Sequence, residues 1–176
     1  MELKEILWLV LTVALVISVV TDVARRRILD LVTYPTMLVA LGLRWAMAGP
    51  GDLESGLISG LAAGGGAGAL FALSAWRGGG FGWGDVKLVA AVGAAFGYPL
   101  MMGGLIFISL AGFLQAIVTL MWDGAVWDTF RGVAARWGKR LKITKSAVVA
   151  PARRIPYGVA IALGSFWAMW WDRSNS

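Results

Sequence analysis

Two aspartates stand at the ends of long apolar segments, where a carboxylate is unusual. Asp22 closes the first apolar run, and Asp85 lies in Gly82-Trp83-Gly84-Asp85, where a glycine-rich segment meets the fourth run. Ionisable groups in or beside membrane spans are costly, so both are candidates for function. The chain has no cysteine and no histidine, which excludes thiol nucleophiles, His-containing triads and thiolate or imidazole metal sites. Catalysis must therefore use carboxylates, lysine, tyrosine or hydroxyls.

A pair of aspartates can hydrolyse a peptide bond without metal, thiol or imidazole. One ionised Asp takes a proton from water while the other, protonated, polarises the carbonyl. Two carboxylates held close together share one proton because both cannot ionise cheaply. Gly82 and Gly84 would leave space for an extended peptide backbone to approach Asp85. If the fold brings Asp22 and Asp85 together, such a pair would be able to carry out aspartyl proteolysis.

Each of these residues also has a purely structural interpretation. Asp85 can cap a helix N-terminus, where a carboxylate satisfies free backbone donors and complements the dipole. Asp22 can be an interfacial residue paired with an arginine of the cluster that follows it. Lys87 can be a charge partner of Asp85 or an interfacial anchor, and we favour the anchor.

The elements that must position these residues are membrane helices. Of the 176 residues, 59% are hydrophobic and only 15% are charged, and the mean hydropathy is +0.74. A span takes about 20 apolar residues, so the chain has room for five to seven spans and no separate soluble domain. We predict an all-α, polytopic membrane helix bundle that forms one domain over residues 1–176. Its six candidate spans are 6–20, 31–47, 56–76, 86–96, 100–122 and 156–171.

Positive charge is distributed unevenly over the loops between these spans. Of the 16 Lys and Arg residues, 13 fall in the first, third and fifth loops or at their borders. The positive-inside rule then predicts that these loops are cytoplasmic and that both termini face out. Asp22 and Asp85 would both lie at the cytoplasmic side. We interpret the net charge of +6 as topological and expect no nucleic-acid partner.

Two further patterns favour packing and membrane contact. Within the fifth loop, residues 126–141 place apolar residues at helical spacing on one face and basic residues on the opposite face. This pattern predicts a basic amphipathic helix in the headgroup layer that contacts anionic lipid. Its alternative role is contact with a substrate's cytoplasmic segment. In the third span, small residues recur every fourth position and would let another helix approach closely: Gly56, Gly60, Gly64, Gly68 and Ala72.

Three segments, in the same order, resemble the type IV prepilin peptidases. These are the stretch from Asp22 through Arg26-Arg27-Ile28 to Thr33, the GxGD motif continued by Lys87-Leu88, and the late segment Pro156-Tyr157-Gly158 with the residues around it. The resemblance covers nearly the whole chain and is closest to the short, peptidase-only branch that serves Tad/Flp-type pili.

The resemblance implies that Asp22 and Asp85 are the catalytic pair and that the other motif residues support the site or bind substrate. It implies cleavage of a prepilin or pseudopilin leader at the cytoplasmic face of a bacterial-type inner membrane, just before the pilin's hydrophobic helix. The cysteine-rich metal site of longer relatives has no counterpart here, so we expect no metal and no cofactor. Pro-Asn commonly follows the Arg-Ile pair, but Leu29-Asp30 stands here. Asp30 is therefore a rival carboxylate, and we rank it as a partner of a nearby arginine or a substrate contact.

Two non-enzymatic hypotheses remain open at this point. In a proton- or cation-coupled transporter, the embedded carboxylates would relay protons or bind cations, although no inverted repeat is visible. A non-catalytic subunit of a pilus or secretion assembly would need only the small-residue stripe and the basic helix. The sequence leaves open the individual substrate, any N-methylation and the oligomeric state.

Overall fold

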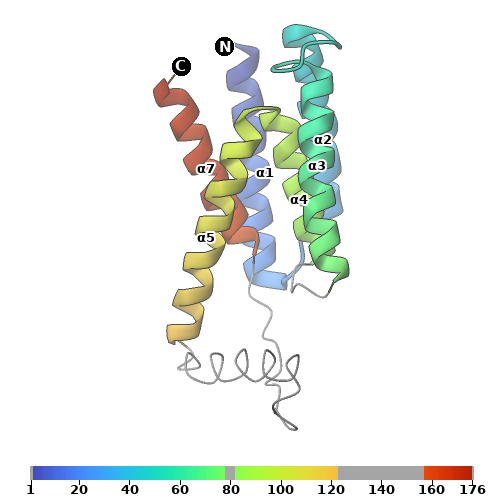
Figure 1. Cartoon of the computed structure of the whole chain (residues 1–176). Helices are drawn as coiled ribbons and strands as arrows, with labels where there is room; N and C mark the ends of the chain where they lie inside the picture. The colour runs from blue at the N-terminus through green and yellow to red at the C-terminus, as the bar shows by residue number, and fades with distance from the viewer. Residues whose placement is uncertain (1, 78–81, 123–156, 176) are drawn as a thin grey trace, which may run out of the picture. The chain divides into compact units, whose positions relative to one another are not determined.

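The computed structural model describes residues 2–77, 82–122 and 157–175, and within these ranges it is entirely helical (Figure 1). Four helices are long and apolar enough to cross a membrane: α1 (Leu3–Arg25), α2 (Asp30–Ala48), α3 (Leu57–Trp76) and, within α5 (Leu100–Trp122), the stretch Leu100–Thr119. The other two described helices are α4 (Trp83–Phe96) and α7 (Gly158–Asn175). The predicted helical membrane bundle is confirmed. The predicted amphipathic helix at 126–141 lies outside the described residues.

The chain divides into two compact units, of which the first, Met1–Gly112 with Pro156–Ser176, holds both aspartates. The described part of the second unit continues α5 from Phe113. In the first unit, the N-terminus and the C-terminus lie at the same end (Figure 1). An ion pair of 2.9 Å between Lys4 and Asp172 joins them there.

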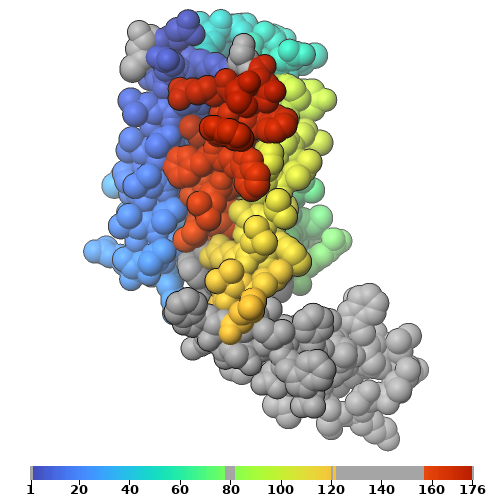
Figure 2. All heavy atoms as spheres, turned by 90° about the vertical axis from the view of Figure 1, so that its left-hand side faces the viewer, coloured from blue at the N-terminus to red at the C-terminus, as the bar shows by residue number. Residues whose placement is uncertain are grey.

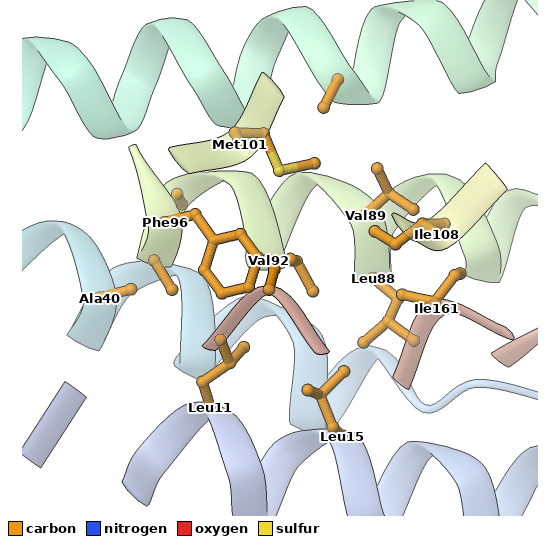
Figure 3. Packing of buried hydrophobic residues seen from close by; sticks show 14 of the residues in the cluster. Leu11, Leu15, Ala40, Leu88, Val89, Val92, Phe96, Met101, Ile108 and Ile161 are labelled. Carbon is orange, nitrogen blue, oxygen red and sulfur yellow. The ribbon is translucent and has the colours of Figure 1, made fainter. Parts of the chain in front are cut away.

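Helix α4 is the central element of the first unit. Its 14 residues correspond to about 21 Å, less than the roughly 30 Å hydrocarbon core of a bilayer. Figure 3 shows Leu88, Val92 and Phe96 of α4 among Leu11 and Leu15 of α1, and all five are at most 3% exposed. The short fourth span predicted from the sequence is therefore a helix enclosed by its neighbours.

The small residues of α3 pack against α4, as the fourfold spacing predicted. A Cβ placed on Gly64 would lie 2.8 Å from the Ala90 carbonyl oxygen, and one on Gly60 would lie 2.8 Å from that of Ala94. Such contacts leave no space for a side chain. The two backbones can approach this closely only because both helices carry small residues where they meet.

The C-terminal end of α4 is held by a buried arginine from α2. Arg44 is 4% exposed and donates hydrogen bonds of 3.0 Å to the carbonyls of both Ala95 and Phe96. Its guanidinium also donates to the Glu54 carbonyl at 2.7 Å and to the Ser59 hydroxyl. Terminal carbonyls of a helix have no partner within it, so Arg44 supplies the donors and places positive charge where the dipole favours it.

Helix α7 returns to the side of α1. Figure 2 shows α7 lying along α1. Trp167 of α7 stacks on Phe107 of α5, with ring centroids 5.1 Å apart. The antiparallel course of α1 and α7 brings the first residue of α7 to the last turn of α1, which matters for the site.

Candidate active site

Asp22 lies inside the last full turn of α1. We expected it to close the span, but the helix runs on to Arg25 and ends where Arg26 adopts a left-handed conformation, φ 52°. The Asp22 side chain is 7% exposed. One carboxylate oxygen, Oδ2, accepts a hydrogen bond of 2.9 Å from the backbone N–H of Gly158.

Gly158 is the first residue of α7, so its N–H has no partner within the helix. Asp22 therefore caps a helix from which it is separated by 136 positions in the chain. The position must be glycine for this contact. A Cβ there would lie 2.7 Å from Asp22 Oδ2 and 3.2 Å from Asp22 Cβ.

Asp85 is the third residue of α4 and is 9% exposed. Its Oδ2 accepts a 2.8 Å hydrogen bond from the backbone N–H of Gly82, just before the helix. The expected capping role is thus present, although Asp85 occupies the third helical position instead of the N-cap. Gly84 abuts the connection between α1 and α2, since a Cβ there would lie 3.0 Å from Ile28 Cβ.

The two carboxylates lie at the same end of the first unit, at the last turn of α1 and the first turn of α4. They are near enough for the charge of Asp22 to act on Asp85. Within the described ranges, neither carboxylate forms an ion pair with lysine or arginine. This arrangement permits the pair to hold one proton between them, because no cation stabilises the doubly ionised form.

Tyr157 borders the same place. It precedes Gly158, its ring lies 6.2 Å from that of Phe71 on α3, and the charge of Asp85 acts on it. Its hydroxyl also contacts Gly112 of α5, where a side chain would not fit. The third predicted segment therefore reaches the carboxylates through both Tyr157 and Gly158. Pro156 lies outside the described residues.

Lys87 and Asp30 do not lie where we expected them. Lys87 Nζ is 2.7 and 2.8 Å from the two carboxylate oxygens of Asp30, so its partner is neither Asp85 nor a lipid headgroup alone. Asp30 is likewise not paired with an arginine within residues 2–77, 82–122 and 157–175. Arg26 and Arg27 are exposed, and neither forms an ion pair with Asp22 in the part of the chain that the structure describes.

Sequence reasoning missed Tyr34, whose ring lies under Lys87 with Nζ 5.2 Å from its centroid. Tyr34 follows Asp30 by one helical turn, so both residues face the same neighbour. That spacing was visible in the sequence. The contact of Tyr34 with Lys87 could not be predicted, because the sequence does not indicate that Lys87 contacts α2.

The two aspartates do not line the apolar groove of this unit. An apolar groove of about 600 Å³ between α3 and the first part of α5 contains neither carboxylate. Within the described ranges, no group of three or more acidic side chains is arranged around a metal position. Both aspartates are more than nine-tenths buried, so any molecule that reaches them must first open the site locally.

Comparison with known protein families gives a match over most of the first five helices. Residues 9–120 match the type IV leader peptidase family. No curated protein and no solved structure matches the chain. The matched region includes Asp22, the GxGD segment and Lys87, whereas Tyr157 and Gly158 lie beyond it.

Proposed function

The chain belongs to the type IV leader peptidase family, and from this premise we propose that it is an aspartic endopeptidase in which Asp22 and Asp85 activate water. The observation that supports this most directly is the pair of buried carboxylates at one end of the bundle. They lie near enough for the charge of Asp22 to act on Asp85, and in the described part of the chain neither forms an ion pair with a lysine or arginine. The family acts on prepilin-type substrates, and the helices make the chain a multi-pass membrane protein.

The proposed reaction moves two protons in each of its two steps. The ionised aspartate removes a proton from water as the oxygen attacks the scissile carbonyl carbon, and the protonated aspartate donates its proton to the carbonyl oxygen. When the tetrahedral intermediate collapses, the C–N bond breaks and the amine nitrogen takes a proton from the carboxyl group formed in the first step, while one hydroxyl of the intermediate returns its proton to the other aspartate, which is ionised at that stage. The two aspartates thus exchange acid and base roles. Buried side chains around them limit competing water.

We further propose that cleavage takes place at the cytoplasmic face of a bacterial-type inner membrane and that the substrates are Flp/Tad-type prepilins. The excess of Lys and Arg in the first, third and fifth loops supports that orientation, with both termini outside. The proposal favours the enzyme over the transporter and scaffold hypotheses because the family match is to peptidases.

The test is cleavage of a co-reconstituted Flp-type prepilin by the purified protein, with mass spectrometry of the products. Asp22→Asn and Asp85→Asn should each abolish cleavage, since a neutral amide can neither take the proton from water nor share one. Asp52→Asn is the matched control: Asp52 is an exposed carboxylate of the α2–α3 loop, and its replacement should leave the rate unchanged. Cleavage by both site variants would refute the assignment. Restored pilus assembly by the double variant would instead support the scaffold hypothesis.

A further inference from the structure

The first turn of α4 carries Asp85, yet its own sequence holds it weakly. Gly82 and Gly84 flank Trp83, and glycine loses more backbone freedom on ordering than any other residue. The opposite end of α4 is fixed by Arg44. The hydrogen bond from Gly82 to Asp85 fixes this turn locally, and contacts from outside the helix add to it.

One such contact is the ion pair between Lys87 and Asp30. Both carboxylate oxygens of Asp30 lie within 2.8 Å of Lys87 Nζ, and the same ammonium lies over the Tyr34 ring. Asp30 is the first residue of α2, where negative charge is favoured by the helix dipole. The pair thus joins the first turn of α4 to the first turn of α2, across 57 positions of sequence.

Helical geometry connects this pair to Asp85. Successive residues of an α-helix are rotated by about 100°, so Asp85 and Lys87 point about 200° apart. One lies on the face toward the bundle interior and the other on the face toward α2, as their exposures show: Asp85 is 9% exposed and the Lys87 side chain is 30% exposed. The ion pair of Lys87 with Asp30 therefore restricts the rotation of the first turn of α4, and with it the inward orientation of Asp85.

We propose that Lys87 and Asp30 are positioning residues, which together set the orientation of Asp85 toward Asp22. The inference rests on the proposed function for its kinetic consequence. The close contact between Gly84 and Ile28 gives the turn a second fixed point. With Lys87 held at one place and Gly84 at another, the turn can neither rotate nor lift away from α2.

The pair should act on orientation more than on folding. Its side chains are 30% and 57% exposed, and partly exposed ion pairs contribute little to stability. Small displacements of a catalytic group, in contrast, lower rates strongly. Loss of the pair should therefore leave a folded protein with an impaired catalytic step.

The kinetic test compares Lys87→Met, Asp30→Asn and the double variant. Each single variant should lower kcat about tenfold and change KM less than twofold. The double variant should match the singles instead of losing about a hundredfold, because residues that act through each other are not additive. Lys87→Arg should recover most of the rate. Multiplicative losses, or a raised KM with unchanged kcat, would overturn the proposal, the latter in favour of direct substrate contact.

The control is the ion pair at the other end of the same unit. Lys4→Met and Asp172→Asn break a pair of similar length that lies about 27 Å from Asp22 along α1. Both variants should keep wild-type kcat. Equal losses in the two sets would show that α4 is not specifically involved.

A second measurement does not depend on activity. The chain has no cysteine, so Asp85→Cys introduces a single thiol whose labelling rate by a small maleimide reports the exposure of this position. Lys87→Met should raise that rate several-fold, and Lys4→Met should not. An unchanged rate overturns the positioning role even if the wild type cleaves prepilin. Absence of wild-type cleavage, with the labelling change present, would refute the proposed function alone.

Discussion

Gly158→Ala is the substitution that most directly tests the geometry at Asp22. The added Cβ would lie 2.7 Å from Asp22 Oδ2, whereas ordinary contacts begin at 3.4 Å. Relief of that overlap requires a shift of about 0.7 Å. The Asp22 side chain must then rotate away from the Gly158 N–H, from which it accepts a hydrogen bond of 2.9 Å. The first residue of α7 and the carboxylate cannot both keep their places.

The magnitude follows from the size of the shift. A displacement of about 1 Å at a catalytic group costs about a hundredfold in rate, so we expect kcat to fall by about 30- to 100-fold. The fold should lose much less. Overpacking of this kind costs about 1–3 kcal/mol, and alanine recovers about 0.4–1 kcal/mol through the unfolded state. The net loss of stability should thus stay near 1–2 kcal/mol.

Steady-state prepilin cleavage and thermal unfolding in the same detergent would measure both quantities. Gly65→Ala is the matched control, because a Cβ at Gly65 of α3 meets nothing within 4 Å. It should leave kcat within about twofold. Wild-type kcat in Gly158→Ala would refute the reasoning that Asp22 needs this contact. An equal loss in Gly65→Ala would show that the assay reports general damage.

Three further outcomes follow from other parts of the fold. Gly64→Val should destabilise the protein by about 1–3 kcal/mol or prevent folding, because its Cβ would lie 2.8 Å from the backbone of α4; the yield of folded protein compared with Gly65→Val decides this. Arg44→Met should lower stability by about 3 kcal/mol in chemical unfolding, since it leaves several buried carbonyls unpaired, and Arg44→Lys should not restore it because one ammonium cannot reach them all. Hydrogen bonds from the Glu54 and Ser55 backbones and the Ser55 hydroxyl lower the pKa of Asp52, so its stabilisation is complete above the unfolded pKa and is lost as pH falls through the lower folded value. Thermal unfolding below about pH 4 should thus be less pH-dependent in Asp52→Asn.

Much of the fold could be predicted because the bilayer restricts the alternatives. The lengths of the apolar runs sufficed for the order of the described helices, and the fourfold spacing of small residues predicted the close packing of α3. The end of α1 was misplaced. Asp22 ends an apolar run but does not end the helix, which continues to Arg25. Asp22 is stabilised inside the helix by a donor from α7.

The two acids of the candidate site could be chosen from the sequence, but the contacts of the residues around them could not. Asp22 and Asp85 stood out because few other groups in an apolar chain can do chemistry. The partner of Lys87 was a matter of helix rotation, which depends on how α4 packs against α2 and α3 together. Local sequence offered Asp85 as its nearest acid, two positions away, where helical geometry prevents contact. The partnership with Asp30 required the tertiary structure.

The absence of a cation beside the aspartates, within the described ranges, has a physical explanation in the helices themselves. Asp22 accepts from the first N–H of α7, and Asp85 lies in the first turn of α4, so each carboxylate meets a helix N-terminus. Two half-charges from aligned peptide dipoles can stabilise one buried negative charge. A full cation would favour ionisation of both acids and so remove the shared proton that the proposed mechanism requires. Lys87 is the nearest lysine to Asp85 in sequence, and its engagement by Asp30 keeps that charge on the other side of α4.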